Sequence, residues 1–74
     1  MTRKKALQQV EIERFHQDTI HPEGVVDSET SVLLLLEELG EYAKDVNDHQ
    51  VIRAKDELIQ VAALAVRALE ELYE

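Results

Sequence analysis

The sequence predicts an all-α fold, in which three helices form one subunit of an oligomer. The chain has 74 residues and contains only one proline and two glycines, so few positions interrupt regular structure. Between these breaks the apolar residues recur at helical spacing, and the alternating β-branched pattern of strands is absent. The short length and the lack of any linker-like segment indicate a single domain over residues 1–74.

Two breaks, at Pro22–Gly24 and Asn47–Asp48, divide the chain into three expected helices over about residues 3–19, 29–46 and 49–72. Proline biases the preceding residue towards extended backbone, and glycine permits a tight turn. Asparagine and aspartate favour turns. Because only two or three residues join the second helix to the third, we expect these two helices to form an antiparallel hairpin.

Side chains that can accept hydrogen bonds mark the expected start of each helix. Thr2 is suited to cap the first helix, and Asp27 or Ser28 to cap the second. The turn residues Asn47 and Asp48 are expected to supply the cap of the third helix. Such caps satisfy backbone N–H groups that have no partner within the helix.

The second and third helices carry more apolar surface than three helices can bury. Ten of the twelve residues from 58 to 69 are apolar, with only Gln60 and Arg67 between them, and residues 32–36 are apolar on every side. A surface helix of a monomer usually shows one apolar stripe. We therefore expect a homo-oligomer in which the hairpins of neighbouring chains pack together.

The charge balance argues against two classes of partner. Eight basic residues stand against 16 acidic residues, which gives a net charge of −8. We expect binding neither to nucleic acid nor to an anionic membrane, since both depend on Lys and Arg side chains. A small phosphorylated ligand would need metal cations between its phosphates and the carboxylates. With no cysteine, no apolar signal-peptide core and no uncharged stretch long enough for a membrane span, we expect a cytoplasmic protein.

Three carboxylates, Glu37, Glu38 and Glu41, directly follow the aliphatic run of the second helix. At 100° per residue, Glu38 and Glu41 lie about 60° apart on one helix face, and Glu37 and Glu41 about 40° apart. Like charges at these spacings repel each other. A divalent cation would offset the repulsion, and oxygen ligands suit Mg²⁺ or Mn²⁺. Gly40, unfavourable within a helix, would let an ion or a ligand come close.

The pattern Glu-Glu-x-x-Glu is weak evidence by itself, because it occurs again at residues 70–74. We interpret that second copy as solvated acid near the end of the chain, and the first copy has the same alternative reading. The first copy differs because the third helix, which is expected to lie beside it in the hairpin, carries Glu57 and Gln60. Glu41 and Glu57 lie at similar distances from the turn, so three or four oxygen ligands can meet between the helices.

Residues 37–41, followed after fifteen residues by residues 57–60, resemble the paired motifs of the MazG-like nucleoside triphosphate pyrophosphohydrolases. That all-α family has E-E-x-x-E and then E-x-x-D. The segment at residues 21–24 resembles the family more weakly, and the whole resemblance covers about residues 15–70. It implies a four-helix-bundle core built from two chains, in a dimer or a tetramer. It also implies Mg²⁺-dependent cleavage between the α and β phosphates of a nucleotide, giving a nucleoside monophosphate and pyrophosphate.

Carried over by position, the resemblance assigns the metal ligands to Glu38, Glu41, Glu57 and Gln60, with Glu37 assisting beside them. The four glutamates are thus the implied catalytic residues. Gln60 departs from the family, which has Asp at this position; an amide oxygen can bind a hard cation but adds no negative charge. An alternative is therefore a non-catalytic helical-bundle oligomer that binds nucleotide or metal without hydrolysis. A purely structural oligomerisation hairpin is a third reading.

Three basic residues near the hairpin end are candidate contacts for phosphate oxygens: Lys44, Arg53 and Lys55. Asp45, one turn beyond Glu41, is a further candidate oxygen ligand for a metal. The histidines at positions 16, 21 and 49 match no zinc-binding pattern, since such a site needs three or four converging ligands.

Overall fold

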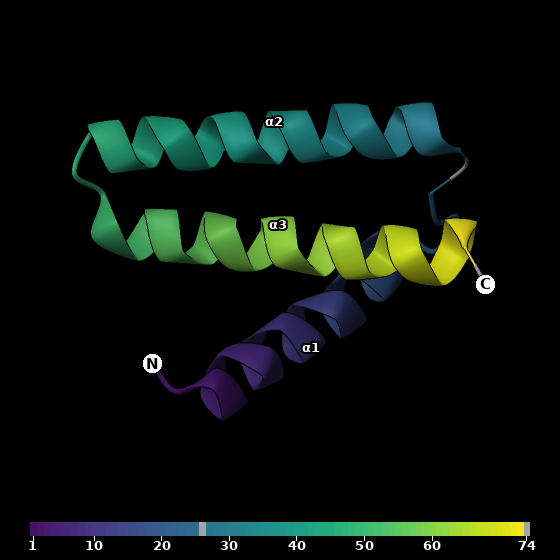
Figure 1. The fold of residues 1–74 in the computed structure, drawn as a ribbon, viewed down its shortest axis with the longest axis horizontal. Helices are drawn as coiled ribbons and strands as arrows, with labels where there is room; N and C mark the ends of the chain where they lie inside the picture. The colour runs from purple at the N-terminus through teal and green to yellow at the C-terminus, as the bar shows by residue number, and fades with distance from the viewer. Residues whose placement is uncertain (26, 74) are drawn as a thin grey trace.

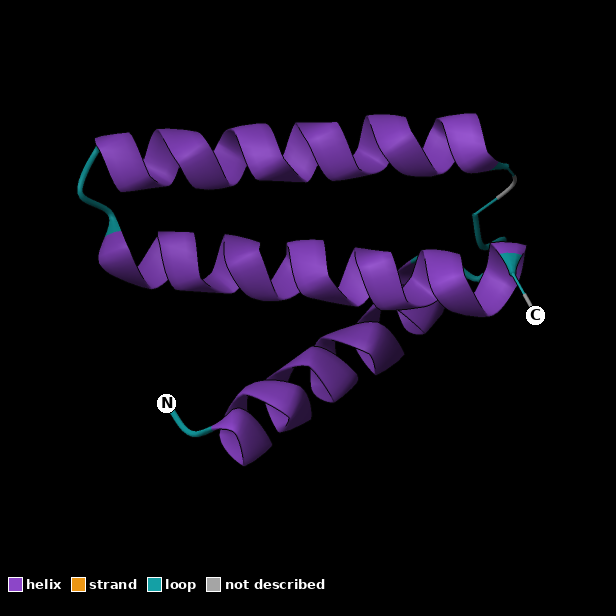
Figure 2. Ribbon diagram, viewed as in Figure 1, coloured by secondary structure: helices purple, strands orange, loops and turns teal. Residues whose placement is uncertain are grey.

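A computed structural model describes residues 1–25 and 27–73 of the chain. It contains three helices, α1 (Arg3–Ile20), α2 (Ser28–Asn47) and α3 (Val51–Leu72). Figure 2 shows that loops connect them, and the described residues include no strand. The prediction of an all-α chain with three helices is confirmed, and each helix boundary lies within two residues of the predicted one.

The helix α3 is the central element, because α1 and α2 both pack against it. α2 and α3 run antiparallel and side by side, and α1 lies obliquely against α3 (Figure 1). The predicted hairpin is confirmed. Its consequence for the site is that residues near the middle of α2 face residues in the first half of α3.

The first two helices begin at the predicted caps. The hydroxyl of Thr2 accepts a hydrogen bond from the Lys5 N–H at 3.1 Å, and the carboxylate of Asp27 accepts one from the Thr30 N–H at 2.7 Å. Asp27, rather than Ser28, is thus the cap of α2. The backbone hydrogen bond from Thr30 holds the pKa of the Asp27 carboxyl below its usual value.

The predicted cap of the third helix is wrong. α2 continues through Asn47, and α3 begins only after Gln50, which makes no side-chain capping bond. The Asp48 N–H donates back to the Lys44 carbonyl, so Asp48 ends α2 instead of starting α3. His49 then turns the chain with a positive φ of 57°.

The buried apolar residues are small, while many large ones are exposed. The buried apolar positions are Ala54, Ala63 and Ala68, all on α3, whereas Leu33 and Leu69 are 68% and 63% exposed. Alanines let helices approach closely but bury little area. None of the described helices combines the length and apolarity that crossing a bilayer requires. Large aliphatic side chains on all three helices are exposed.

Candidate metal site

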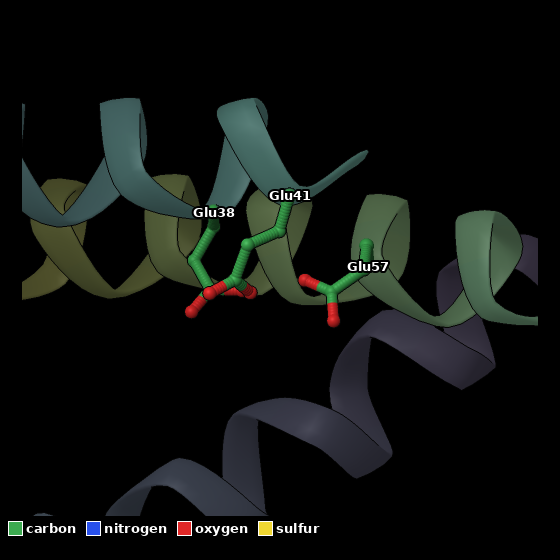
Figure 3. A group of neighbouring side chains, drawn as sticks. All are labelled: Glu38, Glu41 and Glu57. Atoms are coloured by element: carbon green, nitrogen blue, oxygen red, sulfur yellow. The ribbon is translucent and has the colours of Figure 1, made fainter. Parts of the chain in front are cut away.

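The hairpin brings three carboxylates together from two helices. Glu38 and Glu41 extend from α2 and Glu57 extends from α3, and their carboxylates point towards one another (Figure 3). One oxygen from each residue lies within 4.8 Å of the others. We call Glu38, Glu41 and Glu57 the carboxylate cluster. The expectation that Glu41 and Glu57 sit at similar heights along the hairpin is confirmed.

Two oxygens of the carboxylate cluster are buried without a donor. Glu38 Oε2 and Glu57 Oε2 have no hydrogen-bond partner among the described residues. Burying an unpaired carboxylate oxygen is unfavourable, so native structures usually supply a donor, a water or a cation. Glu41 is exposed and leaves the cluster open on its side. One ion bound by the three side chains would give both buried carboxylates a favourable partner.

The carboxylate cluster disfavours its own full ionisation. The neighbouring carboxyl group of Glu57 raises the pKa of Glu41. Burial raises the pKa of Glu57, and the neighbouring carboxyl group of Glu38 raises it further. A divalent cation would reverse this preference, because it stabilises the ionised form of every carboxylate around it.

Two other predicted site residues border the carboxylate cluster. Glu37 is exposed on α2, and its charge contributes to the raised pKa of Glu41. Gln60 is half-buried one turn beyond Glu57, and it lines a cavity together with Glu38. The side chain of Gln60 is thus on the same side of the hairpin as the cluster.

The predicted basic residues lie near the end of the hairpin. Arg53 Nη2 is 3.4 Å from the carboxylate of Asp45, which is only 4% exposed. Asp45 is thus engaged by an arginine and is not a member of the carboxylate cluster. Lys44 and Lys55 are exposed, and Lys55 lines a separate depression beside Tyr42.

A cavity of about 410 Å³ adjoins the carboxylate cluster. Its lining comes from all three helices and from the loop after α1, and includes Gln17, Glu38, Gln60 and Arg67. We call it the central cavity. Its volume falls within the range of about 300–1,000 Å³ that is typical of small-molecule sites. Gln17 is 5% exposed, and its Oε1 has no partner among the described residues.

Glu70 and Glu71 of the second acidic copy are exposed, as interpreted, but their carboxylates also have protein partners. Glu71 accepts hydrogen bonds from the Val25 N–H at 2.5 Å and from Arg67 Nε at 3.1 Å, and Glu70 accepts one from Arg14 Nε at 2.7 Å. The physical reason is that α1 and the following loop lie against the last turns of α3. Glu74 lies outside the described residues.

Sequence reasoning did not identify Gln17 and Arg67 as parts of the site. Arg67 gave a signal, because it interrupts an almost continuous apolar stretch. Gln17 gave none, since nothing in its neighbourhood distinguishes it from the other polar residues of α1. Both are buried where α1 meets α3, and Arg67 donates to the Gln17 carbonyl there.

No family model matches this chain, and comparisons with curated proteins and with solved structures find no match either.

Proposed function

We propose that this protein is a Mg²⁺-dependent nucleoside triphosphate pyrophosphohydrolase, which converts an NTP or dNTP to a nucleoside monophosphate and pyrophosphate. The observation that carries the proposal is the carboxylate cluster, in which oxygens of Glu38, Glu41 and Glu57 lie within 4.8 Å of one another. These are three of the ligand positions that the resemblance to MazG-like enzymes implies. Mn²⁺ would suit the same oxygens.

The residues present fit a hard divalent cation. In octahedral coordination, adjacent oxygens of one Mg²⁺ lie about 3.0 Å apart and opposite ones about 4.2 Å, so side-chain rotations must bring the cluster oxygens, which lie within 4.8 Å of one another, closer together. Glu38 and Glu57 each offer a buried oxygen without a donor. Gln60 would add a neutral amide oxygen from the next turn of α3. Bound Mg²⁺ would neutralise phosphate charge and lower the pKa of the attacking water.

Other residues of the chain would activate the attacking water and bind the nucleotide. Glu37, exposed beside the cluster, would orient the attacking water and accept its proton. The central cavity would receive the part of the nucleotide beyond the phosphates, with the unpaired amide oxygen of Gln17 as a polar contact. Lys44, Arg53 and Lys55 are proposed phosphate contacts at the hairpin end, although Arg53 must then share its charge with Asp45.

We also propose that the active form is a homo-oligomer, a dimer or a tetramer, with a four-helix-bundle core made from two hairpins. Support comes from the exposed aliphatic residues of α2, which include Val32, Leu33, Leu36 and Leu39. Analytical ultracentrifugation at micromolar concentration tests this point. A species of 8.5 kDa, the mass of one chain, would contradict it.

A second candidate function is a bundle that binds metal or nucleotide without hydrolysis. The observation that favours it is Gln60, which supplies no negative charge where the related enzymes have an aspartate. A site with fewer anionic ligands binds the ion more weakly, and metal-assisted hydrolysis depends on an ion that is firmly held.

Product release from a nucleotide panel separates the two candidates. We expect pyrophosphate to be released from at least one NTP or dNTP with Mg²⁺ or Mn²⁺, and Glu57→Gln to lower the rate at least 100-fold. Asp56→Asn is the matched control, because Asp56 is the neighbouring residue and is exposed. A folded protein that releases no pyrophosphate from any triphosphate would contradict the enzyme proposal.

A further inference from the structure

Arg67 is a buried cation that joins the end of α1 to the end of α3. Its side chain is 4% exposed and donates to the carbonyl of Gln17 at 3.4 Å, to the carbonyl of His21, and to Glu71 Oε1 at 3.1 Å. A buried guanidinium is tolerated only when its donors are used. The planar, forked donors of arginine can reach several acceptors at once, which a lysine cannot do in the same way.

Glu71 holds the other end of the loop that follows α1. Its Oε2 accepts a hydrogen bond from the Val25 N–H at 2.5 Å, while its Oε1 stays with Arg67. Gly24 lies under this carboxylate with a φ of +77°, and a Cβ at position 24 would come within 2.9 Å of Glu71 Oε1. Only glycine adopts this backbone conformation easily and leaves room for the carboxylate.

The loop His21–Val25 is therefore held at both ends by one ion pair: Arg67 binds the His21 carbonyl, and Glu71 binds the Val25 N–H. The same loop contributes His21, Gly24 and Val25 to the lining of the central cavity, which also includes Glu38 of the carboxylate cluster. The side chains that fix the loop come from the last turns of α3. Their position is set by the helix that also carries Glu57.

We propose that Arg67 and Glu71 are positioning residues for the substrate: they hold the loop His21–Val25 as one wall of the central cavity, so that nucleotide affinity depends on this ion pair. The inference rests on the proposed function, because the ligand of the central cavity is taken to be the nucleotide. Metal loading at the carboxylate cluster does not depend on the ion pair, since neither residue contributes an atom to the cluster.

The test compares Glu71→Ala with Glu70→Ala on the full chain. The two variants remove neighbouring carboxylates, but Glu70 accepts its hydrogen bonds from Arg14 on α1 and not from the loop. For Glu71→Ala we expect KM for the nucleotide to rise about tenfold and kcat to stay within about twofold. For Glu70→Ala we expect both constants within about twofold. Glu71→Gln keeps an acceptor for the Val25 N–H, so it should recover a large part of the lost affinity.

Two further measurements separate positioning from general destabilisation. The Val25 amide should exchange with solvent at least tenfold faster in Glu71→Ala than in Glu70→Ala. The affinity for Mn²⁺ alone, without nucleotide, should agree within about twofold between them. Arg67→Lys, which keeps the charge but loses the forked donors, should raise KM in the same way.

Three outcomes would overturn the inference. If the unmodified protein hydrolyses no nucleotide, the proposed function fails and this inference fails with it. If the unmodified protein is active and Glu71→Ala has the KM of Glu70→Ala, the inference alone fails. A loss of Mn²⁺ affinity in Glu71→Ala would show that the ion pair supports the whole hairpin and has no specific role in the cavity.

Discussion

Glu38 on α2 and Glu57 on α3 each bury one carboxylate oxygen without a hydrogen-bond donor among the described residues, and both residues belong to the carboxylate cluster. Repulsion between the two charges and the loss of hydration both act against this arrangement. The hairpin nevertheless holds the two side chains together. A divalent cation bound between them would supply the missing favourable interaction.

The first prediction concerns metal-dependent stability. Mg²⁺ or Mn²⁺ at millimolar concentration should raise the melting temperature of the protein, because an ion that binds only the folded state stabilises it. In Glu57→Gln the increase should disappear, and in the control Asp56→Asn it should remain. Without metal, Glu57→Gln should be more stable than the unmodified chain by about 0.5 kcal/mol, since it relieves repulsion. Differential scanning calorimetry with and without the metal measures both effects.

An unchanged melting temperature at 10 mM Mg²⁺ and at 10 mM Mn²⁺ would contradict the first prediction. A metal-free Glu57→Gln variant less stable than Asp56→Asn would also contradict it.

The second prediction concerns pH. Glu41 and Glu57 have pKa values raised above the ordinary 4.5, so between 4.5 and the raised values the folded chain holds more protons than the unfolded chain. The free energy of unfolding then falls as pH rises through that interval. Asp27 and Glu71 act in the opposite sense, because their pKa values are lowered.

Glu57→Gln isolates the contribution of the cluster to the pH dependence. Urea unfolding of the metal-free protein between pH 4 and pH 7 should show that the stability gained by Glu57→Gln grows with increasing pH. A gain that shrinks as pH rises would mean that the cluster pKa values are not raised. In parallel, Mn²⁺ affinity of the unmodified protein should increase with pH, since protons and metal compete for the same oxygens.

The third prediction compares the two glycines. Gly40→Ala should stabilise the fold by about 1 kcal/mol, because alanine is the better helix former and an added Cβ meets no described atom within 4 Å. Gly24→Ala should destabilise by about 1–2 kcal/mol, because φ is +77° and the new methyl group would collide with Glu71. Chemical denaturation of both variants measures the difference. Equal effects of the two substitutions would contradict the described loop.

The fourth prediction concerns Gln60. If the cluster is a catalytic site with one weakened ligand, Gln60→Asp should increase Mn²⁺ affinity about tenfold and increase pyrophosphate release. If the protein is a binding module only, the affinity rises without turnover. Isothermal titration with Mn²⁺ and the product assay should be done on the same preparation. No change in Mn²⁺ affinity would show that residue 60 does not reach the ion.

The sequence was sufficient for the features that depend on local pattern. Pro22 with Gly24 marked one break, and the short turn at Asp48 required an antiparallel hairpin. Helical geometry put Glu38 and Glu41 on one face, and counting residues from the turn put Glu57 opposite them. These steps were enough to predict the carboxylate cluster, and the structure brings the same three residues together.

The remaining features depend on how α1 packs, which no local pattern encodes. Glu70 and Glu71 repeat the acidic motif, but their partners, Arg14 and Val25, are distant in sequence. Gln17 is indistinguishable from an exposed helix residue until α3 covers it. The predicted cap of α3 was wrong for a different reason. Asp48 ends α2, and Gln50, which precedes α3, makes no side-chain capping bond.

The most direct test of the central claim is a crystal structure determined with Mn²⁺, whose anomalous scattering identifies the ion. We predict one anomalous peak between Glu38, Glu41 and Glu57, with an oxygen of each within about 2.3 Å of the metal. Folded protein in 10 mM Mn²⁺ that shows the three carboxylates without an anomalous peak between them would contradict the claim.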